Sequence, residues 1–112
     1  MTETDFEKSS GDVFVDLGFS PAETEELTAK MTLILAMKSV MAERTLTQKQ
    51  AAKVCGTDQP TLSKVLHGRM ESITIDRLAH WLTALGQDVE ITVRRAPATR
   101  HARLHVAATA QP

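Results

Sequence analysis

The 112-residue sequence contains one cysteine, no tyrosine and only 4% aromatic residues. A single cysteine excludes an internal disulfide. Cys55 lies where a small, buried apolar residue is expected, so we interpret it as a packing residue rather than a nucleophile or metal ligand. No apolar run approaches the roughly 18 residues of a membrane-spanning helix. The N-terminus also lacks the basic and apolar regions of a signal peptide. We therefore expect a cytoplasmic protein with one small, aliphatic core and no membrane partner.

Signatures of catalysis are also missing. The sequence has no glycine-rich phosphate loop, and no serine lies in a strand-turn-helix context typical of a nucleophile. The histidines lie far apart and do not show the spacing of a zinc site; they are His67, His80, His101 and His105. We expect no enzyme activity, no metal and no cofactor.

Charge is unevenly distributed along the chain. The formal net charge is −1, yet residues 1–26 contain eight acidic residues and one lysine, a net charge of −7, which leaves +6 for the rest. A basic body is what a protein needs to contact phosphates. The acidic leader, residues 1–19, is expected to be partly disordered, either as a solvated extension or as a surface for a basic protein partner.

Residues 48–66 have the spacing of two short helices joined by a tight turn. Two neighbouring alanines at the fourth and fifth positions allow the helices to approach closely. Gly56, at the ninth position, can adopt the positive φ that ends a helix without a steric penalty. Leu62 and Val65 lie three residues apart, on one face of the second helix. The pattern predicts a helix-turn-helix whose second helix is buried on one side.

Both helices carry capping signals at their N-termini. Thr47 with Gln50 three residues later is typical of a capping box, and Asp58 before Pro60 suits the start of the second helix. The free side of the second helix carries polar residues able to contact base edges or phosphates, namely Gln59, Thr61, Ser63, Lys64 and His67. A hairpin that only packs is the alternative that alanine, glycine and leucine alone leave open.

The flanks of this unit are predicted to be helical as well. Residues 20–44 should form one long helix, because Ser20-Pro21 is a typical start and Arg44 suits the last turn. Its apolar residues cover about half of the circumference, more than a solvated helix needs. A further helix is expected from Ile75 to Leu85, with Trp81 in the core or at an interface.

After Gly86 the apolar residues recur at every second position, as they do in a strand. In residues 88–94, Val89, Ile91 and Val93 alternate with polar residues. A lone strand has unpaired backbone groups along both edges, so we expect it to pair with the same strand of a second copy. A strand docked on the chain's own helices is the alternative. Residues 96–112 show no sustained period and are expected to form a disordered tail.

Three stretches resemble known families. TLTQKQAAKVCGTDQPTLSKVLHG is similar to the helix-turn-helix of XRE-family and phage-repressor domains. VFVDLGF before the long helix and SITIDRLAHWLTALGQDVEITVR after the motif resemble HigA-like antitoxins and their stand-alone relatives. The resemblance covers residues 13–95. It implies a homodimeric repressor that binds a palindromic operator in double-stranded DNA and, when paired with a RelE-like ribonuclease toxin, neutralises the toxin.

The acidic leader contains a group of apolar residues, which are Val13, Phe14, Leu17 and Phe19. If a basic toxin is the partner, these residues could anchor the contact while neighbouring carboxylates lie at its rim. They could equally fold back on the long helix, which would explain its wide apolar face. Both explanations stay open.

We therefore expect a mainly α, phage-repressor-like helix-turn-helix bundle of four to five helices, with one C-terminal β-strand (residues 88–94) paired across a dimer. Residues 20–95 form the DNA-binding domain. Gln59 and Lys64 are predicted to contact bases, Gln48 to bond a phosphate, and other polar residues to fix the register. The predicted DNA-binding residues are Thr47, Gln48, Asp58, Gln59, Thr61, Ser63, Lys64, His67 and Arg69.

The predicted function is that of a sequence-specific repressor, the antitoxin of a type II toxin–antitoxin module that regulates its own operon. A stand-alone helix-turn-helix regulator without a toxin is the alternative within the same class. A protein-interaction adaptor that keeps the fold without binding DNA is the alternative from another class.

Overall fold

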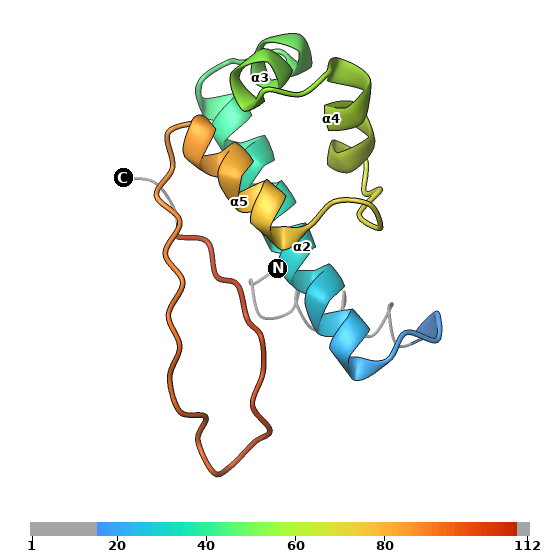
Figure 1. Cartoon of the computed structure of the whole chain (residues 1–112), viewed down its shortest axis with the longest axis vertical. Helices are drawn as coiled ribbons and strands as arrows, with labels where there is room; N and C mark the ends of the chain where they lie inside the picture. Colours follow the sequence, from blue (N-terminus) through green and yellow to red (C-terminus); the bar gives the residue numbers. More distant parts are fainter. Residues whose placement is uncertain (1–15, 110–112) are drawn as a thin grey trace.

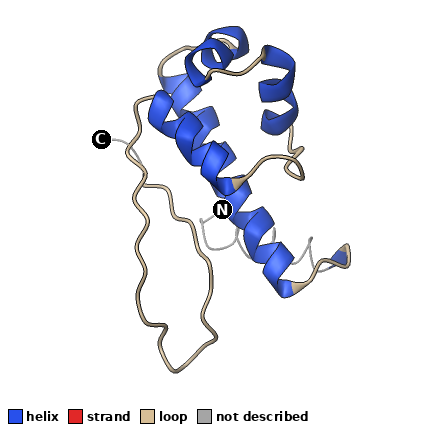
Figure 2. Cartoon of the chain, in the orientation of Figure 1, coloured by secondary structure: helices blue, strands red, loops and turns tan. Residues whose placement is uncertain are grey.

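The computed structural model describes residues 16–109, in which four α-helices are followed by an extended C-terminal segment (Figure 1). In chain order the helices are α2 (Pro21–Glu43), α3 (Gln48–Cys55), α4 (Gln59–Leu66) and α5 (Ile75–Ala84). We call residues 21–85 the helical unit and residues 87–109 the extended segment. The prediction of a mainly α protein is confirmed for this part of the chain (Figure 2). None of the described helices is long and apolar enough to cross a membrane.

The long helix α2 begins at the predicted residue because Ser20 and Glu23 form a reciprocal cap. The Ser20 hydroxyl accepts from the Glu23 main-chain N–H (3.2 Å), and the Glu23 carboxylate accepts from the Ser20 N–H (3.1 Å). Hydrogen bonds from the main chain and side chain of Ser20 to the carboxylate lower the pKa of Glu23. The predicted apolar arc of α2 is largely buried, which explains its width. Its buried apolar members are Ala29, Leu33, Ile34, Met37, Val40 and Met41.

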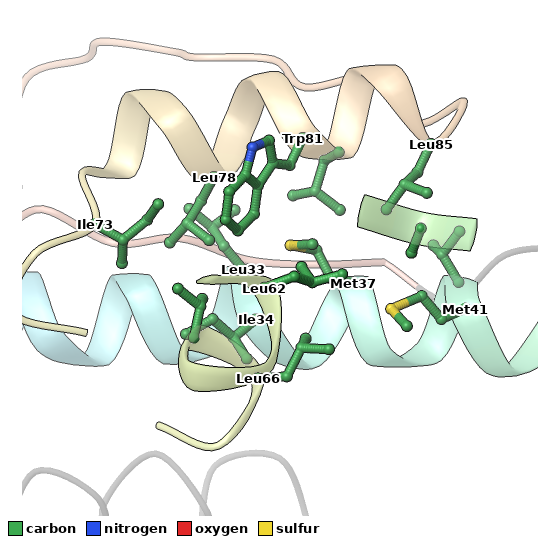
Figure 3. Close-up of a cluster of buried hydrophobic side chains, with 14 of the residues drawn as sticks. Leu33, Ile34, Met37, Met41, Leu62, Leu66, Ile73, Leu78, Trp81 and Leu85 are labelled. Atoms are coloured by element: carbon green, nitrogen blue, oxygen red, sulfur yellow. The ribbon is translucent and has the colours of Figure 1, made fainter. Parts of the chain in front are cut away.

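A single hydrophobic core joins all four helices (Figure 3). The helix α5 crosses α2, so residues from both ends of the helical unit meet. Trp81 is only 3% exposed, which confirms its predicted place in the core or at an interface, and the Arg77 guanidinium lies 5.7 Å from the centre of its ring. The largest fully buried side chains are Met37, Leu62, Leu78 and Leu85.

The predicted strand at residues 88–94 is wrong for this single chain, since residues 16–109 contain no strand. Val89 packs partly against the core, but Ile91 and Val93 are 83% and 93% exposed. A strand needs a neighbouring ladder of N–H and C=O groups, and none is placed beside this segment. These three residues were predicted to form a dimer interface, and the described part of the chain offers them no second strand with which to pair.

The extended segment turns at residues 97–100 and returns toward α2 (Figure 1). The Leu104 N–H donates to a carboxylate oxygen of Glu25 (2.9 Å), and Val106 packs partly against the core. The described part of the predicted tail is therefore attached to the N-terminal half of α2. In Figure 1 the extended segment lies on the side of the molecule away from α4.

Candidate nucleic-acid interface

The first helix of the predicted motif, α3, is fixed at both ends. The Thr47 hydroxyl accepts from the Gln50 N–H (3.1 Å), and the Gln50 side chain accepts from the Thr47 N–H (2.8 Å), which is the predicted capping box. At the other end Gly56 has φ +73°, the left-handed conformation that glycine adopts without penalty. Ala51 and Ala52 are buried, so α3 packs closely on its neighbours. The turn lies where the sequence predicts it.

Cys55 ends α3 and has a packing role. Its thiol lies partly buried beside the core, 3.7 Å from the carbonyl oxygen of Trp81. Burial raises the pKa of the Cys55 thiol. A thiol with a raised pKa is a poorer nucleophile at neutral pH, in keeping with the interpretation from the sequence.

The second helix, α4, begins at the predicted cap. The Asp58 carboxylate accepts from the Thr61 main-chain N–H (2.7 Å). Hydrogen bonds from Thr61 to this carboxylate lower the pKa of Asp58. The apolar face of α4 is buried through Leu62, Val65 and Leu66. The opposite face consists of residues that are exposed or half-buried, namely Gln59, Thr61, Ser63, Lys64 and His67.

A direct hydrogen bond connects the first residues of the two helices. The side-chain amide nitrogen of Gln59 donates to the side-chain oxygen of Gln48 (3.0 Å). Gln48 keeps its own amide N–H groups as donors. Gln59 keeps one N–H and its carbonyl oxygen, the donor and acceptor that match the N7 and N6 atoms of adenine. The bond also restricts both side chains, which lowers the entropy lost on contact with a ligand.

Beyond α4 the chain forms an open, polar hollow. Its lining residues are Thr61, Lys64, Val65, Arg69, Glu71 and Ser72. Gly68, with φ +94°, turns the chain so that the Arg69 N–H donates to the carbonyl oxygen of Lys64 (3.0 Å). Two cationic residues, Lys64 and Arg69, thus line this hollow together with the acidic Glu71.

His67 makes local contacts at the end of α4. Its Nδ1 donates to the main-chain oxygen of Ser63 (2.7 Å) and lies 3.4 Å from the Ser63 hydroxyl. The ring is thus held against its own helix, at the edge of the polar face. Ser63 shares this local hydrogen bonding and is half-buried.

The other predicted binding residues lie elsewhere. Ile91 and Val93 project from the extended segment, and Val89 packs at its base. Leu17 is 69% exposed and Phe19 is 37% exposed, just before α2. Val13 and Phe14 lie outside the described residues. Among the predicted DNA-binding residues, the structure joins Gln48 to Gln59 and Asp58 to Thr61, and it places Thr61, Lys64 and Arg69 around one hollow. The extended segment, which carries the predicted dimer residues, lies away from α4 (Figure 1).

Two features were missed in the sequence. One is the Gln48–Gln59 bond, which depends on how α3 and α4 are oriented and has no signal in the sequence. The other is Lys30, which is 6% exposed although lysine is rarely buried. Lys30 lies four and seven residues before the buried Ile34 and Met37, so its helical spacing could have placed it on the apolar face.

Comparison with known proteins identifies the family of the chain. The family model described as a helix-turn-helix domain matches residues 13–94. A solved structure described as an XRE-family transcriptional regulator is 37% identical in sequence, with a TM-score of 0.70. The match covers 76% of this chain and 97% of that one. The comparison with curated proteins finds no match. The chain thus belongs to this helix-turn-helix domain family and to the XRE family.

Proposed function

We propose that this protein is a sequence-specific DNA-binding transcriptional repressor that inserts the polar face of α4 into the major groove. The single observation that supports this most strongly is the division of α4, whose apolar face lies in the core while its other face presents exposed or half-buried polar side chains. An α-helix fits the major groove, where each base pair has a distinct pattern of donors and acceptors. The similar XRE-family structure, described as a transcriptional regulator, supports the same function.

The geometry supports a division of roles. Gln59 and Lys64 contact bases, and Gln48 contacts a phosphate while it holds Gln59 in place. Arg69 contacts a phosphate from the hollow next to α4. The remaining residues keep the register through caps and backbone contacts; they are Thr47, Asp58, Thr61, Ser63 and His67.

Selection from a pool of random DNA duplexes tests this function and requires no assumption about the operator sequence. We expect the protein to enrich one sequence, here called the selected duplex. The affinity for it, measured by fluorescence anisotropy, should fall steeply with added salt because phosphate contacts release counterions. Failure to enrich any sequence, with no binding at low salt, would favour an adaptor that keeps the fold without binding DNA.

We further propose that two copies pair through residues 88–94 and bind a palindromic operator. An antiparallel pair centred on Ile91 places Asp88 opposite Arg94 and Val89 opposite Val93, on both sides of the two-fold axis. The exposure of Ile91 and Val93 supports this pairing, because apolar side chains this exposed are suited to a partner. A two-fold dimer of this kind matches the symmetry of a palindrome.

A charge exchange tests the register of this pair. Asp88→Arg or Arg94→Asp alone places like charges opposite one another and should shift the protein toward monomer in sedimentation experiments. The double variant restores opposite charges and should restore the dimer. If neither single variant dissociates a dimer, the interface lies elsewhere, with the long helix α2 as the first candidate.

A second function, that of an antitoxin, is favoured by the surface before α2. Leu17 is 69% exposed, so it does not fold back fully on the core and is able to anchor a partner. The surrounding acidic leader suits a basic surface such as that of a RelE-like toxin. Deletion of residues 1–19 should abolish neutralisation of the protein encoded by the neighbouring reading frame and spare DNA binding. If the full chain neutralises no neighbouring protein, it is a stand-alone regulator.

A further inference from the structure

Lys30 is the charged residue that the described chain buries in its core. It is 6% exposed, and an ammonium group in such a place is costly unless it finds partners. Its Nζ donates to the main-chain oxygen of Met70 (3.0 Å) and lies 3.9 Å from a carboxylate oxygen of Glu26, one turn earlier on α2. The hydrogen bond thus joins α2 to a loop 40 residues later in the sequence.

That loop, residues 67–74, directly follows α4 and contacts both the core and the polar surface. The side chain of Met70 is 7% exposed and belongs to the core. Its neighbours Arg69 and Glu71 line the hollow beside α4. Lys30 therefore binds the loop from the core side, through the main-chain carbonyl of Met70, the residue after Arg69.

Arg69 lies between two attachments. On one side, its own N–H donates to the carbonyl oxygen of Lys64 in the last turn of α4 (3.0 Å). On the other, the next residue is bound by Lys30. The backbone of Arg69 is therefore bonded at its own N–H, and the main-chain carbonyl of the following residue is bonded as well, which limits the movement of Arg69 relative to α4.

We propose that Lys30 is a positioning residue for DNA binding, whose bond to the Met70 carbonyl holds Arg69 where its guanidinium meets a phosphate beside α4. This inference rests on the proposed DNA-binding function. An apolar side chain of similar volume usually stabilises a core as well as a buried charge does, or better. Stability alone therefore gives no reason for a lysine here, whereas control of the loop conformation does.

The test is a salt titration of binding to the selected duplex by Lys30→Met, with Arg69→Met as the reference. Loss of one phosphate contact lowers the magnitude of the negative slope of log K against log salt by about 0.9, which corresponds to about fivefold weaker binding at physiological salt. Arg69→Met should show this change. Lys30→Met should show at least half of it, with a melting temperature close to that of the wild type.

A double variant separates positioning from other effects. In the Arg69→Met background, Lys30→Met should leave the slope unchanged, because the contact it positions is already lost. Lys38→Met, which removes an exposed lysine from the same helix, should leave the wild-type slope unchanged. Should Lys30→Met fold poorly, Lys30→Gln is titrated under the same criteria.

Two results would overturn the inference: an unaltered slope for the Lys30 variant, or an equal loss of slope with and without Arg69. In the second case Lys30 would act through bulk charge or general stability. Absence of DNA binding by the wild type is a different result, because it would refute the proposed function itself.

Discussion

The helical unit and the extended segment both carry apolar residues at regular spacing, but their partners differ. In the helical unit, residues on α2 meet residues on α4 and α5, and the resulting core includes Leu62, Leu78 and Leu85 at 1% exposure or less. In the extended segment, Ile91 and Val93 have the alternation of a strand and remain more than 80% exposed. The apolar residues of the helical unit are thus buried within one chain, whereas Ile91 and Val93 of the extended segment stay exposed.

This difference shows what an apolar pattern specifies. A helix forms its backbone hydrogen bonds within itself, so its apolar residues need only a surface on which to pack. A strand needs another strand before its backbone groups are bonded. The apolar pattern of the helical unit is therefore explained by the folding of one chain, whereas the pairing proposed for the extended segment requires a second copy.

The largest expected difference between the two regions is in the loss of free energy of unfolding when one leucine in each is replaced by alanine. Leu62→Ala removes a fully buried side chain at the centre of the helical unit and should lower the free energy of unfolding by roughly 2–5 kcal/mol. Leu104→Ala, on the extended segment, removes a side chain that is 51% exposed and should cost at most about 1 kcal/mol. Urea unfolding measures both. Equal losses would show that the extended segment belongs to the folding core.

A smaller effect is expected at the turn within the helical unit. A Cβ on Gly56 would meet no atom within 4 Å, so the cost of a substitution comes from the backbone, whose φ is +73°. Gly56→Val should cost about 1 kcal/mol or more and weaken DNA binding, while Gly56→Asn should cost less because asparagine tolerates this conformation. Thermal unfolding compares the two. Identical melting temperatures for both variants and the wild type would contradict the conformation assigned to the turn.

The smallest effect concerns the cap of α4 and its dependence on pH. The pKa of Asp58 in the folded state lies below its usual value of 3.8, so ionisation of this group stabilises the fold above that pH. The contribution is lost as the pH falls through the lowered pKa. Asp58→Asn keeps an acceptor oxygen without a charge, so its melting temperature should differ from that of the wild type at neutral pH and converge with it in acid. If the melting temperatures of the two proteins differ by the same amount at every pH in the acid range, the role assigned to the carboxylate is contradicted.

Most of the helical unit could be predicted from the sequence because its signals are local. The capping box of Thr47 and Gln50, the cap at Asp58 and the turn at Gly56 each involve residues within three or four positions of one another. The polar face of α4 followed from the same periodicity, since the spacing of Leu62 and Val65 determines which side is left free.

Features that depend on distant atoms could not be predicted in this way. The acceptor for Lys30 is a main-chain carbonyl 40 residues away, and no side-chain pattern marks it. The Gln48–Gln59 bond depends on the angle between two helices. The strand at residues 88–94 was predicted from alternation alone, but alternation does not supply the neighbouring backbone that a strand requires.

The most direct test of the account is to repeat the selection from random DNA duplexes with Gln59→Ala and with Gln87→Ala. Gln87 precedes the predicted strand and serves as the matched control. We expect the Gln59 variant to lose its preference at one base position in each half-site, corresponding to roughly 1–3 kcal/mol of discrimination, and the Gln87 variant to select the wild-type sequence. If Gln59→Ala selects the wild-type sequence with wild-type affinity, and Lys64→Ala does the same, α4 is not the helix that recognises DNA.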